Sequence, residues 1–160
     1  MPENKKHSKT LASDRKEEVN HLLHGMGKGV YDTLDNGVFP ELALRSRSVK
    51  NIVYSEEVKQ YVLGSSTVRR SSGNVKHIRP FAQLMWLGLF SKLLINQGKT
   101  STLRDVYYSS QAYDIDFTDQ SESDEIITDL EVVLAKSRED FNIYPEERSA
   151  IFGDVTIEYT

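Results

Sequence analysis

The stretch Phe81-Ala-Gln-Leu-Met-Trp-Leu-Gly-Leu-Phe-Ser-Lys-Leu-Leu-Ile95 decides the fold, because apolar side chains crowd about four helical turns there. Such a run predicts a buried core helix. Pro80 suits the first position of that helix, where an amide hydrogen is not needed, and Gly98 suits its C-terminal cap. The rest of the chain must supply the elements that cover this helix.

Two further helices are predicted downstream of the core helix. Thr102 and Asp105 have the spacing of a capping box, so a helix should begin there and run to about residue 111. Another should begin within residues 121–125 and continue through a clean apolar stripe to about residue 138. Residues 150–160 have the pattern of strand and turn. Three helices followed by strands predict an α+β, mainly helical fold with the element order of a winged-helix domain, a CAP-like relative of the helix-turn-helix.

The region before the core helix divides into three parts. Residues 1–15 are polar and charged and are expected to form a mobile tail. Residues 16–34 carry apolar side chains at helical spacing and predict an amphipathic helix, weakened by glycines at positions 25, 27 and 29. Turn signals around short apolar runs predict an arm or small hairpins up to residue 73. We therefore expect a tail (1–15), a helix and arm (16–73), and a winged-helix domain (74–160).

Charge is distributed very unevenly along the 160 residues. The formal net charge is −4, but residues 1–110 hold 17 Lys and Arg against 10 Asp and Glu, whereas residues 111–160 hold 3 against 14. Between residues 45 and 104 there are 11 basic side chains and two acids, Glu56 and Glu57. This asymmetry indicates a polyanion partner, although lysines that only solubilise a surface give the same count.

Composition excludes several classes of function. The chain has no cysteine, which excludes a disulfide framework, a thiolate metal site and cysteine catalysis. No apolar run approaches the roughly 20 residues of a membrane span, and no apolar stretch follows the charged N-terminus as in a signal peptide. The expected location is cytoplasmic, with no membrane partner.

Several motif-like patterns lack the context that their chemistry needs. Gly98-Lys99-Thr100 ends like a phosphate-binding loop, but the required first glycine is replaced by Leu93 and the segment follows a helix. The Gly25-x-Gly27-x-Gly29 pattern lies inside a predicted helix. The four histidines and the Asp114–Asp119 cluster complete neither a zinc nor a calcium ligand set.

The segment Thr100-Ser-Thr-Leu-Arg-Asp-Val-Tyr-Tyr108 carries the strongest candidate for chemistry. On a helix, Leu103, Val106 and Tyr107 share the core-facing side, while Arg104 and Tyr108 emerge together on the opposite face. An arginine beside a tyrosine hydroxyl stabilises the phenolate form of the tyrosine, and its planar guanidinium can bind a phosphate. Both effects favour attack of the tyrosine on a phosphodiester. An ordinary surface Arg/Tyr pair has the same spacing.

This segment resembles the catalytic tyrosine motif of the A subunits of archaeal DNA topoisomerase VI, a family that includes the eukaryotic enzymes making meiotic double-strand breaks. Three other stretches carry the resemblance: Asn74-Val-Lys-His-Ile-Arg-Pro-Phe81, Asp119-Gln-Ser-Glu-Ser-Asp124 and Glu139-Asp-Phe-Asn-Ile-Tyr-Pro-Glu-Glu-Arg-Ser-Ala-Ile-Phe-Gly153. The resemblance is specific from about 74 to 160, fair across residues 46–64, and absent from the first 15 residues.

The resemblance implies a type IIB topoisomerase A subunit that makes 5′-phosphotyrosyl double-strand breaks for ATP-dependent strand passage and relaxation of supercoils. Tyr108 would be the nucleophile and Arg104 would steady the scissile phosphate. Mg²⁺ would be held by a toprim domain that the chain, read as a fragment, lacks after residue 160, so no metal ligand is expected here and the chain alone should not cleave. ATP would be bound by a B subunit in an A2B2 assembly containing a homodimer of A subunits, associated with the nucleoid.

The basic residues between 45 and 104 should bind duplex DNA with little sequence preference and strong salt dependence. The candidate DNA contacts are Arg69, Arg70, Lys76, Arg79 and Lys99. The predicted helix 121–138 is acidic where a groove-reading helix is usually basic; Lys136 and Arg138 in its last turn would match the helix dipole. Two alternatives stay open: a noncatalytic winged-helix DNA-binding regulator, and a docking module that binds no DNA.

Overall fold

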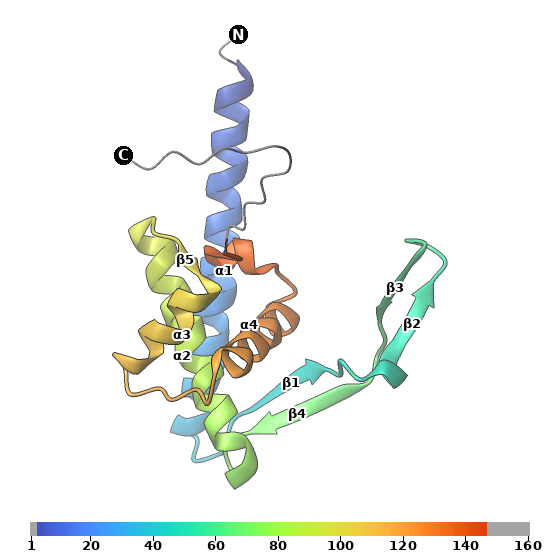
Figure 1. Ribbon diagram of the computed structural model, residues 1–160, viewed down its shortest axis with the longest axis vertical. Helices are drawn as coiled ribbons and strands as arrows, with labels where there is room; N and C mark the ends of the chain where they lie inside the picture. Colours follow the sequence, from blue (N-terminus) through green and yellow to red (C-terminus); the bar gives the residue numbers. More distant parts are fainter. Residues whose placement is uncertain (1–2, 147–160) are drawn as a thin grey trace, which may run out of the picture.

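The computed structural model describes residues 3–146, with side chains from residue 14 onward. Within this range, four α-helices form a body from which a β arm extends (Figure 1). The expected α+β, mainly helical class is confirmed. The strand and turn expected at residues 150–160 lie outside the described residues.

The central helix α2 spans Val75–Gln97. Its N-cap is Asn74, whose side-chain oxygen accepts from the amide of Lys76 at 2.9 Å. Pro80 therefore lies inside the helix, and its expected place at the first position is wrong, because the asparagine cap starts the helix five residues earlier. The expected C-terminal cap is confirmed: Gly98 has φ +64° and its amide donates to the carbonyl of Ile95 at 3.2 Å.

The core forms where α2 packs against α1 (Glu3–Asp35) and α4 (Gln120–Leu134), and α3 (Leu103–Gln111) packs against α4. Leu84 and Leu87 of α2 are fully buried there, as are Ile127 and Leu130 of α4. By length and composition α2 is apolar enough to cross a membrane, but 56% of the relevant window is buried inside the body. Burial against other helices is the pattern of a core helix.

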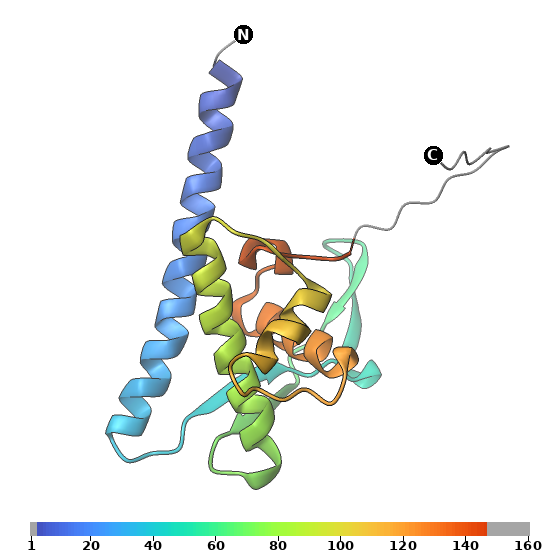
Figure 2. The same cartoon turned by 60° about the vertical axis from the view of Figure 1, so that its left-hand side comes forward.

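Helix α1 lies alongside α2, and its N-terminal half projects beyond the body (Figure 2). From residue 14 onward its buried side chains are Val19 and Leu23, which confirms the predicted amphipathic helix. The helix begins at Glu3, whereas composition predicts a tail through residue 15. Residues 3–24 contain no glycine or proline, so the polar composition that suggested a tail is also compatible with helix.

The arm consists of two consecutive antiparallel ladders, so the predicted hairpins are confirmed. Strands β1 (Glu41–Arg45) and β4 (Thr67–Ser71) form the ladder next to the body. Strands β2 (Ile52–Ser55) and β3 (Gln60–Leu63) form the outer hairpin, which Figure 1 shows standing away from the helices. The short helix η1 (Val49–Asn51) marks the joint between the two ladders.

A buried asparagine holds this joint together. The Asn51 amide donates to the carbonyl of Ser46 at 2.6 Å, and its side-chain oxygen accepts from the Ser66 amide at 3.0 Å. The backbone of Gly64 passes so close that a Cβ atom there would lie 2.7 Å from Asn51 Oδ1. Only glycine fits this approach without a shift, so the turn signal at residues 64–66 marks a close contact between chain segments.

The base of the arm is fixed to α4 by one buried carboxylate. Asp129 is 4% exposed and forms ion pairs with Arg47, at 2.8 Å, and with Arg70. These arginines lie on the two opposite chain segments of the arm. Burial raises the pKa of the Asp129 carboxyl, and the charges of Arg70 and Arg47 act in the opposite direction. One acidic side chain thus ties both sides of the arm to the body.

Helix α4 is shorter than its sequence suggests. It ends at Leu134, because Ala135 adopts the left-handed conformation at φ +49°. Lys136 pairs with Glu18 at 2.7 Å, and Arg138 pairs with Glu131 at 2.9 Å. The expectation that these two cations lie in the last helical turn is therefore wrong; both lie past the helix and join neighbouring elements.

A short parallel strand pair joins the segment before α3 to the segment that follows α4. Strand β5 (Ser101–Thr102) pairs with β6 (Ile143–Tyr144), which follows the short helix η2 (Arg138–Phe141). The side-chain amide of Asn142 donates to the carbonyl of Lys99 at 2.9 Å and reinforces the contact. The bridge places the end of the described chain directly beside the start of α3.

Replacing Asp129 by alanine should loosen the arm, because Arg47 and Arg70 lose their common anchor. Removing one partner of a buried charged contact costs about 1–3 kcal/mol, so local opening should rise by on the order of tenfold. Limited trypsin digestion read by mass spectrometry would detect this as faster cleavage after Arg47 and Arg70.

Glu56→Ala provides the control, since its ion pair with Lys59 is exposed on both sides. Equal cleavage rates in the wild type and in Asp129→Ala would show that the carboxylate does not hold the arm.

Candidate functional site: an exposed tyrosine on a capped helix

The start of α3 is fixed by a complete capping box. The Thr102 hydroxyl accepts from the amide of Asp105 at 3.1 Å, and the Asp105 carboxylate accepts from the amide of Thr102 at 3.3 Å. This is the pattern predicted from the sequence, and the β5–β6 bridge holds Thr102 from the other side. The first turn of α3 is therefore anchored both locally and by a distant segment.

The rotation of α3 about its axis is set by buried side chains on one face. Val106 and Ser110 are fully buried, and Tyr107 packs half-buried against the core. Tyr108, one residue further on, is 57% exposed, and so is the side chain of Arg104. The predicted division of faces is confirmed: Tyr107 points to the core while Arg104 and Tyr108 lie on the outer side.

The two tyrosine rings touch although they lie on different faces. Their centroids are 5.3 Å apart and the ring planes are tilted by 57°. The half-buried Tyr107 ring thus supports one side of the exposed Tyr108 ring, which limits the orientations of Tyr108. The outer tyrosine is accessible to a large ligand and is partly held in place.

Arg104 makes an ion pair that sequence reasoning missed. Its Nε lies 3.0 Å from Oε1 of Glu146, which follows β6 and is partly buried. Glu146 lies 42 positions after Arg104, so no spacing rule connects them; the β5–β6 bridge brings the two segments together.

A groove opens beside this site at the N-terminal end of α3. It has a volume of about 460 Å³ and is lined by residues from the α2–α3 connection, α3 and the segment after η2: Thr100, Ser101, Thr102, Asp105, Tyr144 and Pro145. Asp105 in the groove lies three residues before Tyr108 on α3, and the hydroxyl-rich wall of the groove follows the candidate DNA contact Lys99 in the chain.

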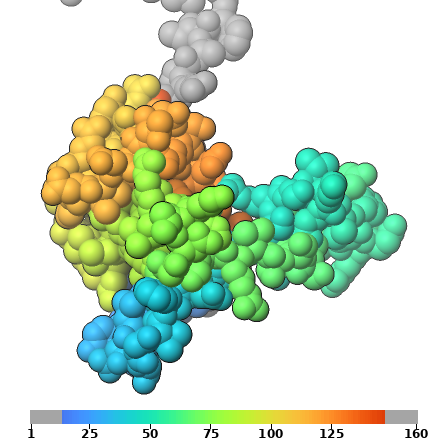
Figure 3. Space-filling view, turned by 90° about the horizontal axis from the view of Figure 1, so that it is seen from below, coloured from blue at the N-terminus to red at the C-terminus, as the bar shows by residue number. Residues whose placement is uncertain are grey.

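The five candidate DNA contacts do not form one free cationic strip. Lys76 and Lys99 are exposed, and Arg69 is largely exposed with a long 3.5 Å ion pair to Glu41. Arg70 is mostly buried against Asp129. Figure 3 shows the molecule from the side on which α2 begins, with the arm extending to one side.

Arg79 joins α2 to the loop between α3 and α4. It donates to the carboxylate of Glu122 at 2.9 Å and to the carbonyl of Asp116 at 3.1 Å. Burial tends to raise the pKa of Glu122, but hydrogen bonds from Thr118 and Gln83, together with the Arg79 charge, lower it overall. About half of the Arg79 side chain remains exposed, so this structural role leaves part of it accessible.

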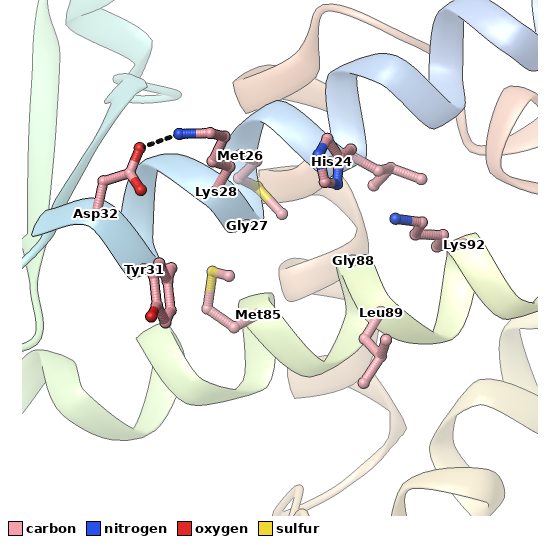
Figure 4. A pocket seen from close by; sticks show the side chains of 11 residues that line it. His24, Met26, Gly27, Lys28, Tyr31, Asp32, Met85, Gly88, Leu89 and Lys92 are labelled. Atoms are coloured by element: carbon pink, nitrogen blue, oxygen red, sulfur yellow. Dashed lines mark hydrogen bonds and ion pairs between the residues drawn. The ribbon is translucent and has the colours of Figure 1, made fainter. Parts of the chain in front are cut away.

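An apolar pocket lies elsewhere, between α1 and α2 (Figure 4). It has a volume of about 610 Å³, and Met26, Tyr31, Met85 and Leu89 project into or along it. Gly27 forms part of its wall, and the nearby Lys28 is paired with Asp32 at 2.5 Å. A second lysine of the lining, Lys92, comes from α2.

Comparison with known proteins identifies the family. Residues 79–143 match the family model described as type IIB DNA topoisomerase, a range that includes α3 and both tyrosines. The chain is 38% identical over 145 residues to the A subunit of type 2 DNA topoisomerase 6 from Methanothermobacter thermautotrophicus; the match covers 90% of this chain and 41% of that protein.

Relatives with the same name give similar values. Identity is 37% over 146 residues with the protein from Halobacterium salinarum and 33% over 147 residues with that from Pyrococcus abyssi. Each match covers 89% of this chain, and 40% and 38% of the respective relative. The chain belongs to the type IIB DNA topoisomerase family. Its similarity is to topoisomerase VI A subunits, of which it spans about two fifths of the length.

The two tyrosines should respond differently to substitution. Tyr107→Ala should lower the free energy of unfolding by about 2 kcal/mol, because it removes a ring that packs on the core. Tyr108→Phe should change it by less than about 0.5 kcal/mol, because the lost hydroxyl belongs to an exposed side chain. Urea unfolding followed by circular dichroism would measure both.

Proposed function

We propose that this chain is the DNA-binding and DNA-cleaving part of a type IIB topoisomerase A subunit. The observation that carries the proposal is the placement of Tyr108: an exposed tyrosine, supported by a second ring, on a helix whose rotation is fixed, with an arginine one turn before it. The family assignment supports a role in DNA topology for the complete protein.

The proposed chemistry is a transesterification. The Tyr108 oxygen attacks the scissile phosphorus and loses its proton to solvent or a base, and a bond forms between that oxygen and phosphorus. The bond between phosphorus and the 3′ oxygen breaks, and this oxygen takes up a proton. The product is a 5′-phosphotyrosyl strand end and a free 3′-hydroxyl. The planar guanidinium of Arg104 would stabilise the charge of the crowded phosphate.

We also propose that residues from Asn74 onward form a winged-helix domain that binds duplex DNA. The order α2, β5, α3, α4, β6 supports this, since helices and short strands follow in the sequence typical of the fold. Arg69, Lys76 and Lys99 are the proposed direct contacts. Arg70 and Arg79 are proposed to act mainly by holding the arm and the α3–α4 loop in place.

The remaining parts of the activity would come from other parts of the assembly. Among the side chains of residues 14–146, no group of three or more His, Asp or Glu lies close enough together to hold a metal ion. We propose that Mg²⁺ is held by a toprim domain outside these residues, and that a second copy of the A subunit, together with an ATP-binding B subunit, completes an A2B2 enzyme. This enzyme would relax supercoils by strand passage in the cytoplasm, at the nucleoid.

DNA binding by the chain should fall steeply as salt increases, because each neutralised phosphate releases counterions. The double change Arg69→Glu with Lys76→Glu should weaken binding and reduce the salt slope by about 2, one for each lost phosphate contact. Fluorescence anisotropy with duplexes of unrelated sequence between about 50 and 200 mM salt would measure both effects.

Lys16→Glu with Lys28→Glu gives the matched control, since it makes the same change of charge on α1. A flat salt dependence, or equal losses from both double variants, would contradict the proposed binding surface.

Cleavage should require Tyr108 in the complete enzyme. In an A subunit that carries this chain, combined with the B subunit, ATP and Mg²⁺, Tyr108→Phe should abolish the covalent DNA adduct. Arg104→Ala should reduce it by a factor of about 100 or more, because it removes a contact to the transition state. Adducts can be counted after denaturing electrophoresis of end-labelled DNA.

Tyr113→Phe is the control for an exposed tyrosine at the end of the same segment and should leave the adduct unchanged. Full adduct formation by Tyr108→Phe would instead favour a noncatalytic DNA-binding role for this helix.

A further inference from the structure

In the DNA-free protein, Arg104 already forms an ion pair with a carboxylate of the same chain. Glu146 Oε1 lies 3.0 Å from Arg104 Nε, and this oxygen is inaccessible to solvent. The contact is an ion pair without the alignment of a hydrogen bond, because Oε1 has no partner among the described residues that satisfies the angular requirements. The carboxylate therefore neutralises the arginine without the directional bonds that a phosphate can form with a guanidinium.

The surroundings of Glu146 make this carboxylate displaceable. Burial raises the pKa of the neighbouring Asp124 carboxyl; the Arg138 charge opposes this, and the Glu146 charge adds to it. Glu146 is therefore repelled by one acid while it is attracted by Arg104. Its side chain is 31% exposed, and it lies two residues after the β6 position that pairs with Thr102. Its backbone is held near α3 while its side chain has access to solvent.

A DNA phosphate and the Glu146 carboxylate are alternative anions for the same guanidinium. The pair with Glu146 holds the arginine at the surface beside Tyr108, where the proposed function requires it, and lowers the net positive charge at that point. A phosphodiester offers two oxygens that can accept from the planar fork, so it can replace a poorly aligned carboxylate.

We propose that Glu146 is a positioning residue that holds Arg104 in the DNA-free protein and is exchanged for a DNA phosphate on binding. This inference rests on the proposed function, because it takes Arg104 to be a phosphate contact. It adds a competition inside the protein: DNA must displace Glu146 before Arg104 can act.

A double-mutant cycle in DNA affinity tests the exchange. Glu146→Gln should raise the affinity for a duplex about fivefold in the wild-type background, and by less than about 1.5-fold when Arg104 is alanine, since coupled charged residues depart this far from additivity. Glu146→Asp should stay close to wild type, because it keeps the charge. Glu125→Gln removes one negative charge from an exposed position of α4 and should have equal effects in both Arg104 backgrounds.

A readout without DNA complements the cycle. The Nε–H resonance of Arg104, observed by NMR, should shift and exchange faster with water in Glu146→Gln and remain close to its wild-type position in Glu125→Gln.

Each outcome is decisive. If the wild-type chain does not bind DNA, the proposed function fails and the inference fails with it. If the chain binds DNA and Glu146→Gln has no effect, or has the same effect with and without Arg104, only the inference is overturned. If the affinity rises only when Arg104 is present, the exchange is supported.

Discussion

The burial of Val106 is the constraint on which the site depends. A helix of nine residues is too short to be stable alone, so its position is set by what it packs against. Burying one valine contributes about 1.5–3 kcal/mol, and Ser110 lies buried one turn further along the same face. With this face turned inward and the first turn held by the capping box, Tyr108 has one available direction, which is outward.

Ion pairing changes the meaning of the charge asymmetry along the chain. The basic half and the acidic half do not simply face different partners: Arg47 and Arg70 neutralise Asp129, and Arg79 neutralises Glu122. Part of the excess positive charge between residues 45 and 104 is therefore used to attach the arm to α4 and to attach α2 to the α3–α4 loop and the first turn of α4. The surplus that remains exposed is smaller than the sequence suggests, and it is concentrated on fewer residues.

Local features of the sequence predicted local structure well. The capping box at Thr102, the glycine cap at position 98 and the hairpin strands were all recognisable, because each depends on residues a few positions apart. The start of α2 was predicted too late, at Pro80, because the side chain of Asn74 caps the helix five residues earlier in the chain than that proline would. The end of α4 was also missed, since no glycine or proline marks the left-handed residue Ala135.

Contacts between distant residues could not be read from spacing. Arg47 and Asp129 are 82 positions apart, and Arg104 and Glu146 are joined only because β5 pairs with β6. The sequence identified Arg104 and Tyr108 as neighbours on one face, but it could not show that Arg104 already forms an ion pair with Glu146. The same holds for Arg70, whose charge suggested DNA and whose burial shows an internal partner.

These contacts bear on how the proposed cleavage would be controlled. A tyrosine nucleophile must be exposed to reach a duplex, yet an exposed and fully activated nucleophile would attack without control. In the described part of the chain Tyr108, the proposed nucleophile, lies outward on α3 against the Tyr107 ring, and Arg104 is paired with Glu146. On the proposed function, cleavage then requires two events from outside: a phosphate that displaces the carboxylate, and a metal brought by another part of the assembly. On the proposed exchange, Arg104 becomes available only when a DNA phosphate replaces Glu146, so the activation of Tyr108 would depend on the presence of its substrate.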